Sequence, residues 1–126
     1  MKNNLKKISE KEILKTILDW AKYQKDLTAI RINVIGVPIP KKNTYRPSAH
    51  VGISDIIICI RGKILCVECK SPRGTLSHNQ KIFKEKIEKT GGIYIIARSL
   101  EDVTHIVKII RENTTFNDLN KQMKFK

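Results

Sequence analysis

The fold is decided by residues 52–70, which read GISDIIICIRGKILCVECK. Two apolar runs, 55–60 and 63–70, are separated only by Arg61 and Gly62. Two strand-length runs joined by two residues, one of them glycine, predict a β-hairpin with a tight turn. This hairpin would form the middle of the sheet.

The register of that hairpin puts two acidic side chains opposite each other. If Ile60 pairs with Lys63, then Asp55 lies opposite Glu68, and directly opposed residues share one face of the sheet. Lys70 joins that face, because residues two apart on a strand point the same way. Two partly desolvated carboxylates this close repel each other and need positive charge nearby. Lys70 supplies part of it, and a divalent cation such as Mg²⁺ or Mn²⁺ would supply the rest.

A less specific interpretation of these three residues stays open. An Asp at the entrance of a strand and an exposed Glu–Lys pair are common features that contribute little to stability. The spacing alone does not decide between that interpretation and a metal site.

The rest of the chain predicts helices on both sides of the hairpin in an α/β fold. Helical periodicity runs from residue 9 to about 24, from 77 to about 90, and over 100–111. Further strands are expected at 29–34 and at 93–97, the latter buried on both faces. Each helix follows a serine suited to cap it: Ser9, Ser77 and Ser99. The order α-β-β-β-α-β-α predicts a mixed β-sheet flanked by helices.

A length of 126 residues favours one domain, which we place at residues 1–112, followed by a polar, basic C-terminal tail at 113–126. A long basic segment, residues 36–54, is expected to form a turn-rich loop, and loops of that length are often functional. The candidate phosphate contacts are Lys41, Lys42, Tyr45, Arg46, Arg73 and Lys81. Such contacts position a nucleic acid without reading its sequence. For many of these side chains, the alternative interpretation is an exposed charge that is solvated by water and has no binding role.

The composition narrows the classes of function. Lys and Arg number 25 against 12 Asp and Glu, a net charge of +13, which attracts polyanions such as DNA. Only 6% of residues are aromatic, which argues against a base-stacking platform. Apolar runs are far shorter than the roughly 20 residues of a membrane-spanning helix. We therefore expect no membrane association and a cytoplasmic location. The three cysteines, an odd number, agree with free thiols in a reducing cytosol.

A zinc site and a catalytic histidine are not expected. Cys66 and Cys69 form a C-x-x-C motif, but three residues apart on a strand they point to opposite faces. Buried apolar thiols are the better interpretation. The histidines His50, His78 and His105 are given no catalytic role.

In order, the motifs resemble those of the VRR-NUC family of small nucleases, within the PD-(D/E)xK superfamily. The first motif begins at Gly52 and reads G-x-S-D-I-I. The second begins at Gly62 and reads G-K-x-L-x-V-E-x-K-S-P-x-G-x-L-S-x-N-Q. The third begins at Gly91 and reads G-G-x-Y-I-I-A-R-S-x-E-D-V. The resemblance covers about residues 9–107 and implies a restriction-endonuclease-like fold. Ser54 stands where the motif often has proline, and Cys69 lies inside E-x-K, but neither position has to offer a side-chain ligand.

The resemblance implies a metal-dependent phosphodiesterase that acts on DNA. Asp55 and Glu68 would ligate Mg²⁺, or Mn²⁺ in its place, together with the backbone carbonyl of Cys69. Lys70 would orient the attacking water and favour its deprotonated form. Gln80 would hold the site from the following helix. The pair Ser77 and Gln80 also fits a helix capping box, so Gln80 has a structural interpretation as well.

A glutamate of the first helix would complete the ligand set. Glu10 precedes Ile13 by three residues, which is the usual family position. Glu12 adjoins Ile13 and has a capping explanation with Ser9. We therefore favour Glu10 and keep Glu12 as the alternative.

The resemblance further implies branched DNA as substrate, as for Holliday-junction resolvases. Small stand-alone members resemble phage enzymes that act as homodimers, so a phage or prophage gene in a bacterial host is expected. One alternative is a less selective nickase or restriction-type endonuclease. Another is a non-catalytic DNA-binding module, which would bind DNA without cutting it.

Overall fold

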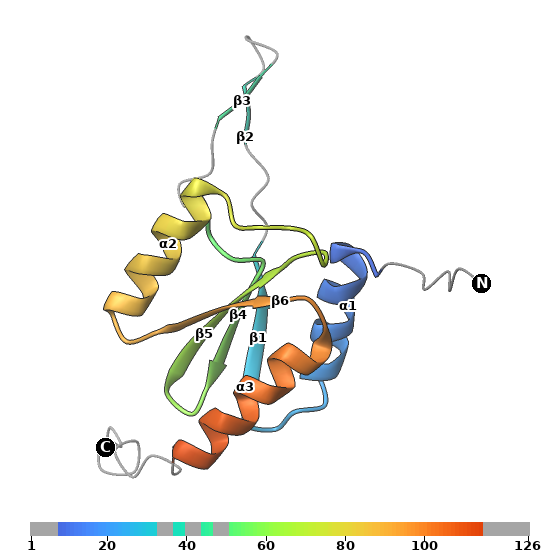
Figure 1. Cartoon of the computed structure of the whole chain (residues 1–126), viewed down its shortest axis with the longest axis vertical. Coiled ribbons are helices and arrows are strands. Elements are labelled where there is room, and N and C mark those ends of the chain that lie inside the picture. The colour runs from blue at the N-terminus through green and yellow to red at the C-terminus, as the bar shows by residue number, and fades with distance from the viewer. Residues whose placement is uncertain (1–7, 33–36, 40–43, 47–50, 115–126) are drawn as a thin grey trace, which may run out of the picture.

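The structure, a computed structural model, describes residues 8–32, 37–39, 44–46 and 51–114 (Figure 1). The main sheet has the strand order β1-β4-β5-β6. These strands are β1 (Leu27–Arg31), β4 (Ile56–Ile60), β5 (Lys63–Cys69) and β6 (Ile93–Ala97). β4 pairs antiparallel with β1 and with β5, whereas β5 and β6 are parallel. The sheet is therefore mixed, as the sequence predicts.

Three helices flank the sheet: α1 (Glu10–Ala21), α2 (His78–Lys89) and α3 (Leu100–Asn113). The order of helices and main-sheet strands confirms the predicted α-β-β-β-α-β-α arrangement. Ser9 and Ser77 cap their helices through their side chains. Ser99 stands at the third N-cap but its side chain makes no capping hydrogen bond, so that detail of the prediction is wrong. Instead, the Asp102 carboxylate accepts the N–H of Arg98 at 2.8 Å.

The segment expected to be a long loop contains two short strands. β2 (Val37–Ile39) and β3 (Thr44–Arg46) pair antiparallel in a separate ribbon that extends from the main sheet (Figure 1). Strands of three residues, one with a proline, give almost no periodic signal. Lys41 and Lys42 lie outside the described residues, and so do the side chains of Tyr45 and Arg46.

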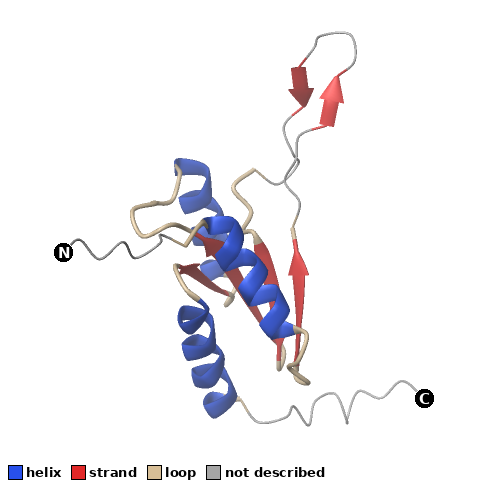
Figure 2. Cartoon of the chain, turned by 90° about the vertical axis from the view of Figure 1, so that its right-hand side faces the viewer, coloured by secondary structure: helices blue, strands red, loops and turns tan. Residues whose placement is uncertain are grey.

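The core lies between the sheet and the pair α1 and α3, which cover one face (Figure 2). Ile17 of α1 and Val107 of α3 are completely buried against alternate residues of β4 and β5. α2 lies on the other face, where the rings of Phe83 and Tyr94 meet edge to face at 6.2 Å. β6 is an edge strand whose fully buried side chains are Tyr94 and Ala97, so the expected burial on both faces is only partial. None of the helices in the described ranges could cross a membrane.

The central hairpin has the predicted register. Ile60 pairs with Lys63, and the ladder continues to the couple Ile56 and Val67. One residue further along, Asp55 and Glu68 fall opposite each other at the end of the ladder. The acidic pair therefore lies on the face of the sheet that carries α2.

The hairpin turn is held by a distant cluster of charged residues. Arg61 and Gly62 have φ angles of 47° and 77°, the left-handed conformation that a two-residue turn of this kind requires. For arginine this conformation costs about 1 kcal/mol. Its guanidinium donates to Asp26 at 3.2 Å and to the carbonyl oxygens of Arg111 and Thr114 at 3.0 and 2.9 Å. These bonds offset the strain and fix the turn against the end of α3.

Candidate active site

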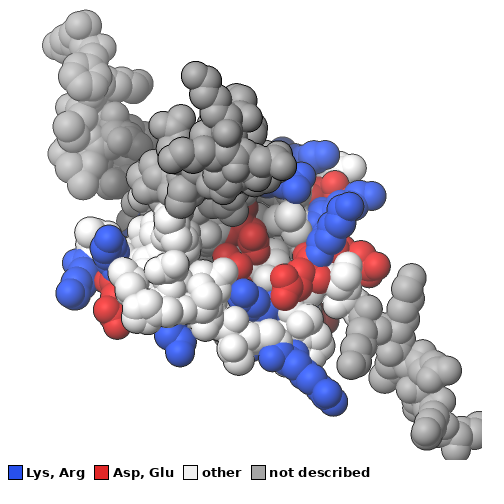
Figure 3. Space-filling model, turned by 90° about the horizontal axis from the view of Figure 1, so that it is seen from above, with Lys and Arg blue, Asp and Glu red and all other residues white. Residues whose placement is uncertain are grey.

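Four chain segments converge at the end of the sheet drawn uppermost in Figure 1. They are the start of β4, the end of β5 and the first turns of α1 and α2. Figure 3 looks onto this end and shows acidic and basic side chains next to one another. The predicted site residues of the described ranges come from these segments.

Asp55 stands immediately before β4 and continues the ladder with its side chain. Its Oδ2 accepts the N–H of Cys69 at 2.8 Å. The N–H of Lys70 bonds to Ala97 in β6, so strand geometry directs both the N–H and the C=O of Cys69 toward the β4 side. The Asp55 carboxylate and the Cys69 carbonyl oxygen thus lie on the same side of β5, as a shared ligand set requires.

Glu68 is buried, with only 4% of its surface exposed. Its Oε1 accepts a hydrogen bond from Gln80 Nε2 at 2.8 Å and lies 3.7 Å from Lys70 Nζ. Its Oε2 is buried and has no hydrogen-bond partner among the described residues. A buried carboxylate oxygen without a partner is costly. Such an atom is suited to bind a cation.

Burial raises the pKa of Glu68 to about 7, and the charge of Asp55 adds to the rise while Lys70 opposes it. The carboxyl group therefore changes charge near neutral pH. Burial also raises the pKa of the neighbouring Tyr94, whose hydroxyl oxygen lacks a partner among the described residues too. The positive charge of Lys70 therefore does not fully compensate the Asp55 and Glu68 carboxylates, as the sequence analysis expects for two opposed acids.

Gln80 both caps α2 and bonds to Glu68. Its Oε1 accepts the N–H of Ser77 at 2.8 Å and its own N–H donates to Ser77 Oγ at 3.2 Å, which is a complete capping box. Its Nε2 takes no part in the cap and donates a hydrogen bond to Glu68 Oε1. The cap fixes the amide orientation, so α2 presents a preorganised donor to the site.

Gly52, the first residue of the G-x-S-D motif, lies against the first turn of α2. Its φ is 83°, and a Cβ atom there would fall 2.3 Å from the Asn79 carbonyl oxygen and 2.9 Å from the Gln80 nitrogen. Only glycine allows both this conformation and this approach. The segment that leads to Asp55 thereby packs against the helix that carries Gln80. The sequence offered no sign of this contact beyond the motif itself.

The first helix brings Glu10, and not Glu12, to the end of β5. Glu10 Oε1 accepts the N–H of Ser71 at 3.2 Å. The backbone N–H of Glu12 donates to Ser9 Oγ at 3.2 Å. The side chain of Glu12 lines a groove between α1 and β1. The positions agree with the preference for Glu10.

Arg98 makes a contact beside the candidate site that the sequence analysis did not predict. Its Nη1 donates to the carbonyl oxygens of Ser71 and Gly74 at 2.5 and 2.9 Å, and so fastens the turn that follows Lys70. Arg73 is exposed in that turn, and Lys81 is exposed in the first turn of α2. Both candidate phosphate contacts therefore lie beside the site, although no described contact assigns them a role.

The donor set fits a hard divalent cation. No group of three or more His, Cys, Asp or Glu side chains within the described ranges could hold a metal by itself. The possible ligands are the Asp55 and Glu68 carboxylates and the Cys69 carbonyl, all oxygen donors of the kind that Mg²⁺ prefers. Burial and the nearby carboxylates raise the pKa of the Cys69 thiol to about 12, so it stays protonated. Burial likewise raises the pKa of Cys66, and these thiols do not favour zinc.

The fold and the convergent strand ends define a restriction-endonuclease-like α/β domain. A solved structure described as a VRR_NUC domain protein has the same fold, with a TM-score of 0.59 over 82% of this chain and 88% of that chain. The two sequences are 18% identical, so the likeness establishes the fold. No protein-family model matches this chain. No curated protein sequence matches it either.

Proposed function

We propose that this protein is a metal-dependent endonuclease that hydrolyses phosphodiester bonds in DNA. The observation that supports it most is the buried Glu68 carboxylate, with one oxygen unpartnered among the described residues, opposite Asp55 and next to Lys70. A net charge of +13 and the VRR-NUC fold agree with a polyanionic substrate. A protein that only binds DNA would gain nothing from two opposed acids facing a phosphate backbone.

Each residue has a role that follows from its position. Asp55, Glu68 and the Cys69 carbonyl would hold the cation, with Glu10 completing the set directly or through water. A bound Mg²⁺ or Mn²⁺ ion would neutralise phosphate charge and make the attacking water more acidic. Lys70 would orient this water and favour its deprotonated form by its positive charge.

Gln80 and the first turn of α2 would face the scissile phosphate. A helix N-terminus favours anions because its backbone N–H groups and dipole are positive there. Gln80 also holds the Glu68 carboxylate in place at 2.8 Å. Arg73 and Lys81, exposed at the rim of the site, would contact the flanking phosphates, as would Lys41, Lys42 and Arg46.

We further propose branched DNA, such as a four-way junction, as the preferred substrate. This rests on the VRR-NUC resemblance of the motifs. A junction has two symmetric scissile strands, so a homodimer would present one site to each. A phage or prophage gene expressed in the bacterial cytoplasm would fit such an activity.

The test is cleavage of end-labelled four-way junctions, flaps, linear duplexes and single strands in Mg²⁺, in Mn²⁺ and in EDTA. The wild-type protein should cut in either metal and stop in EDTA, and it should prefer the junction. Glu68→Gln and Asp55→Asn should lose cleavage while still binding DNA. Glu85→Gln makes the same chemical change at an exposed position of α2 and should keep it.

Other outcomes would revise or reject the proposal. Equal cutting of linear duplex would indicate a less selective nickase or restriction-type enzyme. DNA binding without cleavage of any substrate would leave a binding module. Full activity of Glu68→Gln would remove Glu68 from the catalytic machinery.

A further inference from the structure

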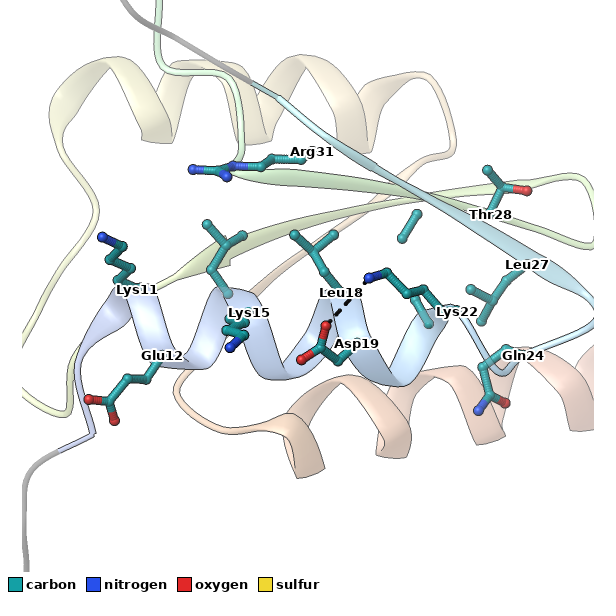
Figure 4. A pocket seen from close by; sticks show the side chains of 13 residues that line it. Lys11, Glu12, Lys15, Leu18, Asp19, Lys22, Gln24, Leu27, Thr28 and Arg31 are labelled. Atoms are coloured by element: carbon teal, nitrogen blue, oxygen red, sulfur yellow. Dashed lines mark ion pairs between the residues drawn. The ribbon is translucent and has the colours of Figure 1, made fainter.

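A groove of about 720 Å³ separates α1 from β1 on the side of the sheet away from β6 (Figure 4). Its apolar floor is formed by Leu14, Leu18, Ala21, Leu27 and Ala29. Leu18 points from α1 toward β1, as Figure 4 shows. None of the residues proposed for catalysis lines this surface.

The wall formed by β1 is an open strand edge. β1 pairs with β4 and with no other described strand. The N–H of Ile32 bonds to the carbonyl of Asp55 at 2.8 Å, so in an antiparallel ladder Thr28 and Ile30 also bond toward β4. The backbone N–H and C=O groups of Ala29 and Arg31 therefore point outward. An extended segment could bond to them as a fifth strand.

The charges around the groove favour an acidic occupant. Lys11, Lys15, Lys22 and Arg31 line it, against Glu12 and Asp19. Asp19 and Lys22 pair with each other at 3.7 Å, which leaves Lys11, Lys15 and Arg31 against Glu12. Glu12 points away from β1 (Figure 4). Lys11 and Lys15 lie four residues apart, on one stripe of α1 that borders the groove.

Charge also argues against occupants from this chain. A second copy would bring the same basic rim against itself. Residues 1–7 carry three lysines and no acid, and residues 115–126 carry three lysines and one aspartate. Both termini would be repelled by the rim, whereas an acidic segment of another protein would be attracted.

We propose that the groove between α1 and β1 is a docking site for an extended, acidic segment of a partner protein, which adds to β1 as a fifth strand. Main-chain bonds to Ala29 and Arg31 would hold the segment. Apolar side chains would pack on Leu14 and Leu18, and acidic ones would meet Lys11, Lys15 and Arg31. Since β1 ends beside Asp55, the partner would be held one strand away from the candidate active site.

The probe is a blocked peptide of about seven residues, a common strand length, that carries two valines flanked by two glutamates on one face and threonine at the positions between them. Valine and glutamate must share a face because the apolar floor and the basic rim lie on the same side of the sheet. The peptide is titrated into ¹⁵N-labelled protein. We expect shift changes at Ala29, Arg31 and Leu18, and slower hydrogen exchange of the Ala29 and Arg31 amides on binding. A valine–lysine peptide, and a valine–glutamate peptide with alternate amides methylated, should each bind at least about tenfold more weakly.

Two variants test the two halves of the site separately. Ala29→Pro removes an outward donor without removing a bond to β4, and Lys15→Glu reverses a charge at the rim. Each should weaken peptide binding at least about tenfold, whereas Lys108→Glu, on the exposed side of α3, should not. Unchanged amide signals in β5 and α3, away from both substitutions, confirm that each variant is folded.

The proposal fails if the peptide at about 1 mM perturbs none of the β1 amides. It fails equally if the lysine peptide binds as well as the glutamate peptide, or if both groove variants bind like the wild type. A short DNA duplex is titrated in parallel. If DNA, and not the peptide, perturbs Ala29 and Lys15, the groove is a nucleic-acid surface and the peptide site is rejected.

Discussion

Replacing Glu68 with glutamine should stabilise the metal-free protein at alkaline pH, although it removes a central residue of the site. Glu68 is buried with one oxygen unpartnered among the described residues, and burial and Asp55 raise its pKa from 4.5 to about 7. The folded protein therefore binds this proton more tightly than the unfolded chain does. Consequently the contribution of Glu68 to the free energy of unfolding should be most favourable below about pH 4.5 and fall as pH rises to about 7.

The size of the effect follows from the pKa change. Each unit of difference corresponds to about 1.4 kcal/mol, so ionising Glu68 should cost the folded state on the order of 3 kcal/mol by pH 8. Glutamine has the same shape and no charge to desolvate. It can still accept the hydrogen bond from Gln80 through its Oε1. Glu68→Gln should therefore lack this loss of stability.

The assay is urea unfolding in EDTA between about pH 4 and pH 8.5, with the two proteins compared at each pH. Taking the difference cancels the titrating groups that do not interact with Glu68. The advantage of Glu68→Gln should grow between about pH 4.5 and pH 7 and then stay constant. Glu85→Gln, an exposed change on α2, should show no such trend.

A difference between Glu68→Gln and the wild type that does not vary with pH would refute this reasoning. So would a difference that grows as pH falls, because it would mean that the folded state favours the ionised carboxylate. Either result would place Glu68 in a solvated or well-paired environment, contrary to its burial.

Three further predictions concern the site and its frame. Lys70→Ala should lower single-turnover cleavage by about 10²-fold or more while Mn²⁺ binding persists, and unimpaired cleavage would exclude Lys70 from the reaction. Gly52→Ala should destabilise the protein by more than about 1 kcal/mol in urea unfolding and weaken cleavage, because of its positive φ and the 2.3 Å approach to Asn79. A neutral effect would show that the two segments can separate. The pKa of Asp26 is lowered, chiefly by hydrogen bonds from Arg111, so its stabilisation should be present above about pH 4 and lost as pH falls below it. Asp26→Asn should cost about 2 kcal/mol at pH 7 in the same measurement and unfold with less dependence on acid pH; equal stability of the two proteins at neutral pH would contradict this.

The central hairpin was predictable because local chemistry specifies it. Arg61 and Gly62 fix a two-residue turn, and the turn fixes the register of both strands. The meeting of Asp55, Glu68 and Lys70 then follows from strand geometry alone. The position of these three side chains is therefore encoded in one short, continuous stretch of the chain.

The surroundings of the acids were less predictable because they depend on how helices cross the sheet. The packing of α1 on the sheet places Glu10, and not Glu12, within hydrogen-bond distance of Ser71 after β5. The tether from Arg98 to the turn at Ser71, and the contact of Gly52 with α2, join residues far apart in sequence. No periodicity or local spacing encodes such contacts.

The ribbon formed by β2 and β3 was missed for a different reason. Its strands are only three residues long, and the surrounding segment is rich in turn-forming residues. At that length a period of two cannot be distinguished from irregular chain.

The central claim is that Asp55 and Glu68 together bind a divalent cation. It is tested most directly by crystals grown in Mn²⁺, with data collected to record the anomalous signal of manganese. We expect one or two anomalous peaks within about 2.5 Å of oxygens from both carboxylates, and none in Glu68→Gln crystals under the same conditions. A map with no peak there, from protein that cuts DNA in Mn²⁺, would contradict the claim.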